Sequence, residues 1–137
     1  MAELLVPADA EVEVVAELNE RMPDHNFPAM DAGTRIPGDR PGEFIRVIVT
    51  GGAERDLVTD EPILVIEAFA ETETRAARGC AYAVACIQAA AREGRVGKAV
   101  CHSARVVSLP ANLPMPSVPD RFRFTATLSV ALRRASV

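Results

Sequence analysis

An alternation of apolar and polar side chains over residues 122–132 constrains the fold of this chain more than any other feature. The apolar positions are Phe122, Phe124, Ala126, Leu128, Val130 and Leu132. Arginine or hydroxyl side chains stand between most of them. Successive side chains of a β-strand point to opposite faces of a sheet. The pattern therefore predicts a strand with one face in a core and the other face solvated or paired.

Four further segments have the character of strands. Residues 44–50 are mostly β-branched or aromatic, residues 63–70 form an apolar run, and residues 100–109 form a weaker run. The fourth segment, residues 33–36, predicts a short strand. We expect the two glycines after residue 50 to break the chain there, so that residues 51–61 form a projecting loop.

Two segments repeat apolar residues at helical spacing. The first covers residues 9–21, with Asp9 as its cap, and is expected to stop before Pro23. The second is about twenty residues long, begins after the acidic residues 71–73 and ends at Gly94. The order of elements predicts an α+β fold, with a largely antiparallel sheet of four to five strands, two helices packed on one face, and projecting loops.

Size and composition limit the class of protein. The chain has 137 residues, so we expect residues 1–137 to form a single domain around one core. Its net charge is −4, so the protein lacks the overall positive charge of a non-specific nucleic-acid binder. No apolar stretch approaches the length of a membrane span, and no secretion signal opens the sequence. We expect a soluble protein made in a cytoplasm, with no membrane partner.

No residue pattern predicts a catalytic, cofactor or metal site. The chain has three cysteines, too few for a disulfide framework. Cys80 and Cys86 are six positions apart, about 240° around a helix, so they do not face one metal ion. His25 and His102 belong to no nucleophile motif. We therefore expect no catalytic residue, no cofactor and no metal.

Charged residues suggest complementary surfaces. Arginines on the predicted strands are suited to DNA phosphates or to the acidic face of a neighbouring subunit, and a solvated surface is the alternative. DNA recognition is disfavoured because interleaved aromatic residues and a helix-turn-helix pattern are absent. The basic set is Arg46, Arg105, Arg121, Arg123, Arg133 and Arg134, and the acidic set is Glu11, Glu13, Glu17, Glu71 and Glu73.

Several longer segments resemble, in order and spacing, the tail terminators of long-tailed, non-contractile bacteriophages, especially those of phages of actinobacteria. They are residues 34–47 (TRIPGDRPGEFIRV), residues 50–52 (TGG) with 55–60 (RDLVTD), residues 67–73 (EAFAETE) and residues 113–125 (LPMPSVPDRFRFT). The resemblance covers most of the chain. Residues 23–31 depart from it and are assigned no role.

The resemblance implies an α+β subunit that closes into a ring, typically a hexamer, on the finished tail tube. The implied partners are further copies of the chain, the tail tube protein and a head–tail connector or stopper protein, while DNA only passes through the lumen. The implied location is the neck of the virion, and the host cytoplasm during assembly. The residues themselves add that two arms, 51–61 and 109–121, suit the two different faces that a head-to-tail ring requires.

The resemblance also suggests interface residues. The residues at matching motif positions, and therefore the interface candidates, are Arg46, Arg55, Leu57, Asp60 and Arg121. Further candidates on the second arm and on the strand after it are Leu113, Met115 and Arg123. Salt bridges that stabilise turns are the alternative role for the charged members.

Two other functions stay open. One is another neck protein, such as a head completion or stopper subunit, which shares the size, the environment and the ring symmetry of a terminator. The other is a small cytoplasmic enzyme or ligand-binding domain that uses Cys101, His102 and Arg105.

Overall fold

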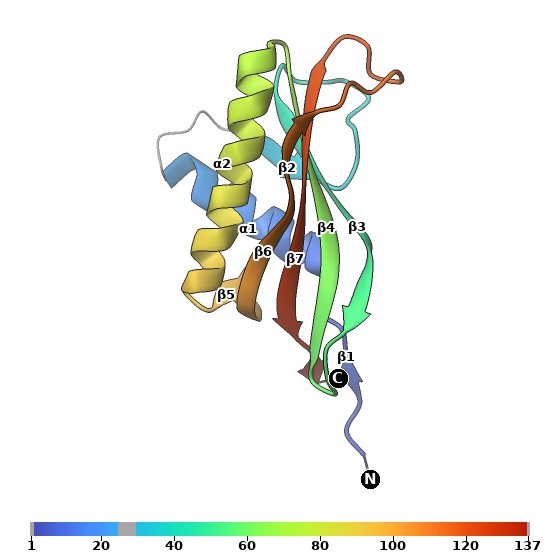
Figure 1. Cartoon of the computed structure of the whole chain (residues 1–137), viewed down its shortest axis with the longest axis vertical. Helices are drawn as coiled ribbons and strands as arrows, with labels where there is room; N and C mark the ends of the chain where they lie inside the picture. Colours follow the sequence, from blue (N-terminus) through green and yellow to red (C-terminus); the bar gives the residue numbers. More distant parts are fainter. Residues whose placement is uncertain (1, 25–29, 137) are drawn as a thin grey trace.

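The computed structural model describes residues 2–24 and 30–136 and has an α+β fold (Figure 1). The α+β class and the two helices are therefore confirmed. In chain order the elements are β1 (Leu5–Val6), α1 (Ala10–Asp24), β2 (Asp31–Gly33), β3 (Phe44–Glu54), β4 (Thr59–Ala70), α2 (Glu73–Arg92), β5 (Arg95–Val96), β6 (Ala99–Asn112), β7 (Phe122–Arg133) and β8 (Ala135–Ser136).

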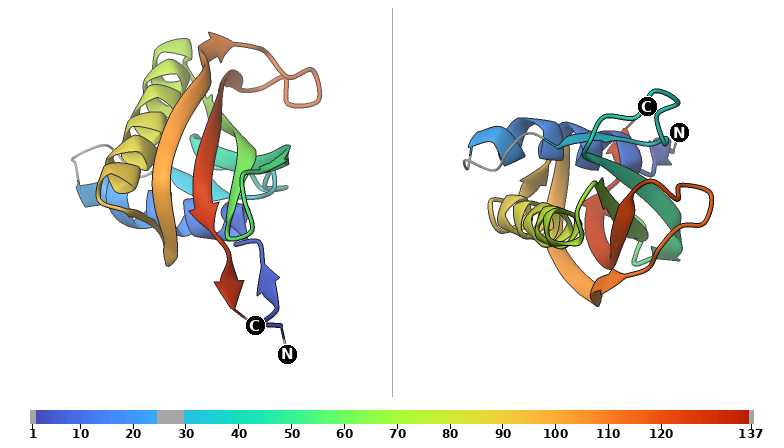
Figure 2. Two further views of the ribbon diagram at one scale, coloured as in Figure 1. Left: turned by 60° about the horizontal axis from the view of Figure 1, so that its bottom comes forward. Right: turned by 90° about the horizontal axis from the view of Figure 1, so that it is seen from above.

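The main sheet has six strands in the order β2-β3-β4-β7-β6-β5. β2 runs parallel to β3, while the other neighbouring pairs of the described sheet are antiparallel. A separate two-stranded ribbon pairs β1 with β8, which lie side by side apart from the main sheet (Figure 2). The expected sheet of four to five strands was too small, because two-residue strands such as β5 carry no recognisable alternation.

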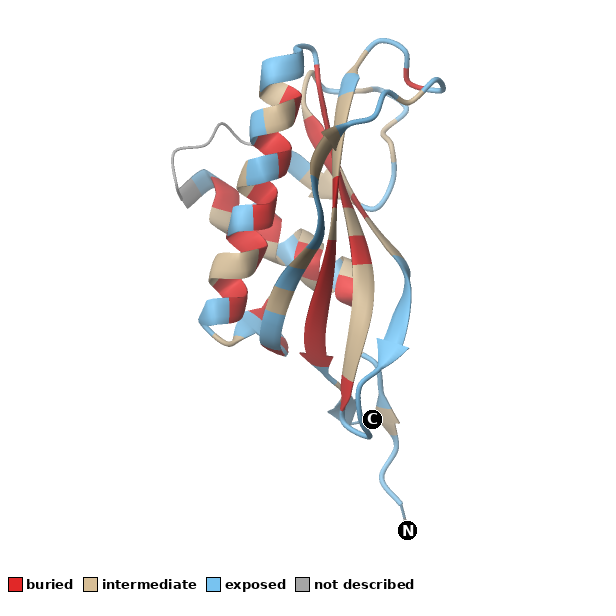
Figure 3. Cartoon of the chain, viewed as in Figure 1, coloured by how far each residue is buried: buried red, intermediate tan, exposed pale blue. Residues whose placement is uncertain are grey.

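Both helices share one core with the inner face of the sheet. Buried residues gather where α2 lies against the strands (Figure 3). Small side chains allow this close packing: a Cβ added at Gly79 would lie 3.7 Å from Cβ of Ala68 on β4 and 2.5 Å from Cε of Met30, which precedes β2. The inner face supplies Ile45, Val47, Leu64, Ile66, Ala126, Leu128, Val130 and Leu132.

A second, smaller cluster lies on the opposite face of the sheet. The rings of Phe44 and Phe69 stack with their centroids 4.7 Å apart. Val118 is buried against them, with Ile36 and Met115 at the edge of the cluster. The arm expected at residues 109–121 does not project freely, because Met115 and Val118 anchor it to the body.

Several element boundaries differ from those that the sequence predicted. α1 continues through Pro23, which sits near its end, where the loss of one backbone hydrogen bond is tolerated. β3 continues through Gly51 and Gly52, with a bulge between Val49 and Gly52. Both glycines have positive φ, 118° and 128°. The expected loop 51–61 is thus a strand extension closed by a short turn. The short strand expected at 33–36 lies instead at 31–33.

The expected core face of β7 is buried only in part. Ala126 and the apolar residues that follow it are buried, but Phe122 is 43% exposed because β7 begins near one end of the sheet. Ser129 and Ala131, on the opposite face, are also buried. Residues 128–132, in the second half of β7, are therefore buried on both faces of the sheet.

Candidate interaction surfaces

Glu67 is a buried carboxylate held between two arginines on the outer face of the sheet. Its side chain is 3% exposed, against 19% for Arg46 and 17% for Arg123. Nη1 of Arg123 donates to Oε2 of Glu67 at 2.6 Å, and Nε of Arg46 donates to Oε1. Nε of Arg123 also donates to the carbonyl oxygen of Leu113 at 2.6 Å. These two expected interface arginines thus tie β3, β4 and β7 together within one chain.

Arg121 joins two loops of the same chain. Its side chain is 11% exposed, and Nη2 donates to the carbonyl oxygens of Pro41 at 3.1 Å and Arg40 at 3.4 Å. Arg40 in turn forms an ion pair of 3.4 Å with Asp120. The loop 34–43 is therefore fastened to the loop 113–121, and Arg121 acts within the subunit.

Asp60, another expected interface residue, is also paired internally. Its carboxylate accepts hydrogen bonds from Arg134 at 2.7 and 2.9 Å. Nη2 of Arg134 also donates to Glu54 at 2.8 Å. These bonds link the extended part of the β3–β4 hairpin to the end of β7.

Two expected interface residues, Arg55 and Leu57, lie at the exposed tip of this hairpin. Leu57 is 81% exposed. The turn is fixed from within, because Asp56 accepts hydrogen bonds from the N–H groups of Val58 and Thr59, each at 2.9 Å. The bond from Val58 is the main reason that the pKa of Asp56 is lowered. The turn thus holds Leu57 out in solvent.

Exposed apolar side chains gather at two opposite ends of the molecule. The hairpin tip and the terminal ribbon lie at the lower end in Figure 1, and the 113–121 loop lies at the upper end. The lower end exposes Leu4, Val6, Leu57 and Val58, and the upper end exposes Leu109, Leu113 and Phe122. Sequence reasoning had singled out Leu57 and Leu113 but missed the others. Residues 4–6 are all apolar and belong to no predicted helix or strand, and this could have predicted an exposed apolar segment there.

The basic set expected on the strands is mostly neutralised within the chain. Four of its arginines form the contacts described above, so only Arg105 and Arg133 are exposed and form no ion pair with a described residue. Part of the acidic set is also engaged. Glu11 accepts a hydrogen bond from the N–H of Val49 at 2.8 Å, and Glu17 pairs with Arg21 at 2.8 Å. The basic and acidic sets therefore do not form two broad surfaces of opposite charge on the described part of the chain.

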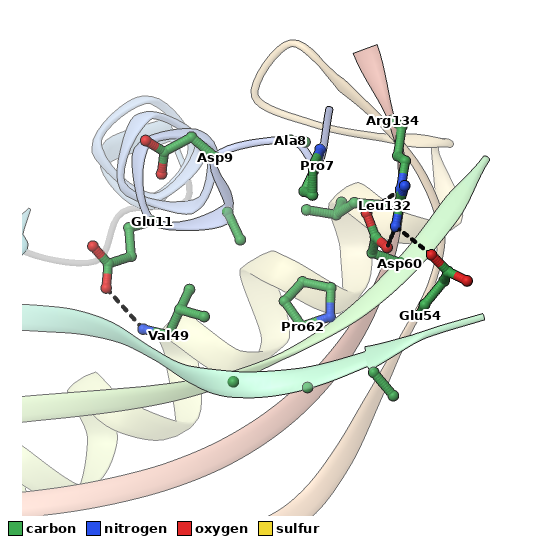
Figure 4. Close-up of a pocket in the computed structure, with 14 residues that line it drawn as sticks. Pro7, Ala8, Asp9, Glu11, Val49, Glu54, Asp60, Pro62, Leu132 and Arg134 are labelled. Atoms are coloured by element: carbon green, nitrogen blue, oxygen red, sulfur yellow. Dashed lines mark hydrogen bonds and ion pairs between the residues drawn. The ribbon is translucent and has the colours of Figure 1, made fainter. Parts of the chain in front are cut away.

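A groove of about 550 Å³ separates the start of α1 from the β3–β4 extension (Figure 4). Its floor includes Val49, Pro62 and Leu132. Four carboxylates line it: Asp9, Glu11, Glu54 and Asp60. Asp9 accepts a hydrogen bond from the N–H of Val12 at 3.2 Å, and the other three are engaged as described above. The groove therefore offers an apolar floor, with its carboxylates already used in local contacts.

The residues of the enzyme alternative do not form a nucleophilic site. Burial raises the pKa of the Cys101 thiol, which donates a hydrogen bond to the carbonyl oxygen of Ser103 at 3.3 Å. His102 is exposed on the neighbouring position, and His25 lies outside the described residues. Burial also raises the pKa of Cys80, to about 12. A thiolate nucleophile requires a lowered pKa, which is the opposite direction.

Clusters of metal-ligating side chains and helices that could cross a membrane are both absent from residues 2–24 and 30–136. In these ranges, no three or more His, Cys, Asp or Glu side chains converge in a way that could hold a metal ion. No helix there is both long enough and apolar enough to cross a membrane.

Comparison of the sequence with protein-family models and with curated proteins identifies no relative. No protein-family model matches the sequence, and no curated protein matches it. The resemblance to tail terminators therefore rests on the sequence segments given above.

Proposed function

We propose that this chain is the subunit of a ring that caps the tail tube of a long-tailed phage, ends tube polymerisation and provides the surface for head docking. The observation that carries the proposal is the presence of exposed apolar side chains at two opposite ends of one body. Leu57 and Val58 lie at one end, and Leu109, Leu113 and Phe122 at the other. Grouped exposed apolar side chains mark interaction sites. A terminator needs two such ends, one for the tube and one for the head.

The internal ion pairs support the same proposal. The contacts of Arg121 and Arg123 fix the 113–121 loop before any partner binds. A loop that is already ordered loses less conformational entropy on binding. Leu113 is therefore presented at the upper end in a defined position, which suits a protein that acts by geometry and uses no catalytic residue or cofactor.

The partners and the location follow from the resemblance. The ring contains several copies of the chain, typically six, in the neck of the virion. The tail tube protein binds one face of this ring, and a connector or stopper protein of the head binds the other. Assembly takes place in the host cytoplasm.

The test measures assembly and capping separately. Sedimentation velocity across a range of concentrations gives the mass of the assembly, and negative-stain imaging with purified tail tubes shows whether rings sit on tube ends. We expect rings at the ends and a stop to tube growth. Taking the hairpin tip as the end that faces the tube, Leu57→Glu should abolish capping, whereas Glu71→Gln, at an exposed site just before α2, should not. A protein that stays monomeric at every concentration and ignores tubes would refute the proposal.

The same two-ended arrangement fits a second candidate, another neck protein such as a stopper or head completion subunit. The two candidates differ in the partner that they bind. Mixing the protein with purified portal or adaptor rings, and separately with tail tubes, distinguishes them. Binding to the head-side rings alone would favour the stopper function.

A further inference from the structure

The terminal ribbon and the residue before it leave apolar side chains exposed. Leu4 is 70% exposed and Val6 is 43% exposed. The ribbon is held by two residue pairs, Leu5 with Ser136 and Val6 with Ala135. It extends away from the main sheet (Figure 2). An isolated two-stranded ribbon is at best marginally stable in water, so contact of residues 2–6 with another surface would stabilise it.

A groove with two exposed valines lies beside the base of this ribbon. Its volume is about 430 Å³, and it borders the groove of Figure 4, with which it shares residues 7–9 and Arg134. Val12 of α1 is 56% exposed and Val100 of β6 is 37% exposed. Residues 2–6 of the same chain, here called the N-terminal arm, begin at the edge of this groove and lead away from it. The two valines therefore stay uncovered in the single chain.

Charge at the rim of the groove complements the arm. Lys98 and Arg133 line the groove, are exposed and form no ion pair with a described residue. The arm, residues 2–6, carries a single charged side chain, Glu3, next to Leu4. Among the described residues of its own chain, only the neutral hydroxyl of Ser136 donates a hydrogen bond to the Glu3 carboxylate. Asp9 and Glu13 also line the groove, but Asp9 is engaged as the cap of α1.

We propose that residues 2–6 of one copy lie in this groove of a second copy, with Leu4 against Val12 and Val100 and with Glu3 close to Lys98 or Arg133. The contact rests on the proposed ring and names one of its subunit interfaces. Arm and groove are different surfaces of the same chain, so the contact is heterologous. Heterologous contacts of one kind, repeated from copy to copy, generate rings when the rotation closes.

Disulfide trapping between two different variants tests the contact directly. A tagged Leu4→Cys chain is mixed with an untagged Val100→Cys chain under mild oxidation, so that only a contact between copies yields the mixed dimer. We expect a strong mixed dimer. Wild-type protein, whose described cysteines are buried, should give none. Leu109→Cys serves as the matched control because Leu109 is 75% exposed but lies on β6 toward the other end of the molecule.

A charge exchange gives an independent readout. Glu3→Lys should weaken self-association several-fold, and mixing this variant with a Lys98→Glu, Arg133→Glu chain should restore it. Failure of the mixture to recover would overturn the proposed arm contact. So would a Leu4→Cys chain that couples to Leu109→Cys as readily as to Val100→Cys.

The failure of this contact is distinguishable from the failure of the proposed function. A Leu4→Asp protein that still forms rings and caps tubes as the wild type does would overturn the arm contact and leave the terminator proposal intact. Efficient Leu4–Val100 trapping in a wild-type background that caps no tubes would support the contact and refute the terminator. A wild-type protein that never self-associates would overturn both.

Discussion

Replacing Glu67 with glutamine should destabilise the protein more than any other isosteric change on the outer face of the sheet. Glu67→Gln keeps the shape of the side chain but removes the charge that two arginines share. The NH2 group of the new amide also faces one of the two arginines, so two hydrogen-bond donors meet there. Losing one partner of a buried ion pair costs about 3–5 kcal/mol. Because Arg46 and Arg123 keep 19% and 17% of their side chains exposed, water partly compensates them, and we expect about 3 kcal/mol.

The assay is urea unfolding followed by far-ultraviolet circular dichroism at a concentration where the protein is monomeric. In a thermal melt of the same variant, a loss of about 3 kcal/mol corresponds to a fall in Tm of about 12 °C for a chain of this size. Glu61→Gln is the matched control, since Glu61 lies on the same strand and forms no ion pair with a described residue; it should change stability by less than about 0.5 kcal/mol. If Glu67→Gln costs no more than this control, the cluster does not tie the three strands together.

Three further predictions follow from burial and backbone geometry. Val118→Ala should lower the free energy of unfolding by about 2 kcal/mol, because it empties space against the stacked phenylalanine pair, whereas the exposed Ser117→Ala should be neutral in the same urea titration. Gly52→Ala should lower Tm more than Gly51→Ala. Both positions have positive φ, but only at Gly52 would the new Cβ meet a backbone oxygen of the facing strand, at 2.3 Å. Equal losses of Tm in the two variants would contradict this geometry. Burial raises the pKa of Cys80 from 9.0 to about 12, so the thiol's contribution to stability is present below pH 9.0 and is lost as pH rises toward 12. The native protein should therefore resist alkylation at pH 8. Rapid labelling of Cys80 without unfolding would argue against its burial.

Local patterns predicted the elements whose causes are local. The second helix is an example, because Thr72 accepts a hydrogen bond from the N–H of Arg75 as an N-cap, and a residue with positive φ, Gly94, follows the end of the helix. The long strands β4 and β7 were likewise visible in their own side-chain patterns. Where a neighbouring strand overrides local preference, the sequence misled. Gly51 and Gly52 predict a break, yet Gly52 pairs with Pro62 and continues β3.

The candidate site was harder to predict because its contacts are long-range. Whether an arginine is a free surface charge depends on which carboxylate the strand register places beside it. Arg46 and Arg123 meet Glu67 only because β3 and β7 flank β4 in the sheet. Arg121 is satisfied by backbone carbonyl oxygens, which no residue pattern reveals. The terminal ribbon depends on pairing between positions more than a hundred residues apart, and its strands are too short for a periodic signal.

The two ends of the molecule differ in how they are prepared for binding. At the upper end, four prolines restrict the backbone of residues 109–120, and Val118 and Arg121 anchor the loop on the body. A partner there meets an ordered surface and binds with a small loss of conformational entropy. At the lower end, the terminal ribbon is held by two residue pairs, so a partner must supply much of its order. Contacts made by the ribbon should therefore form cooperatively with assembly, while the upper face is complete in the single subunit.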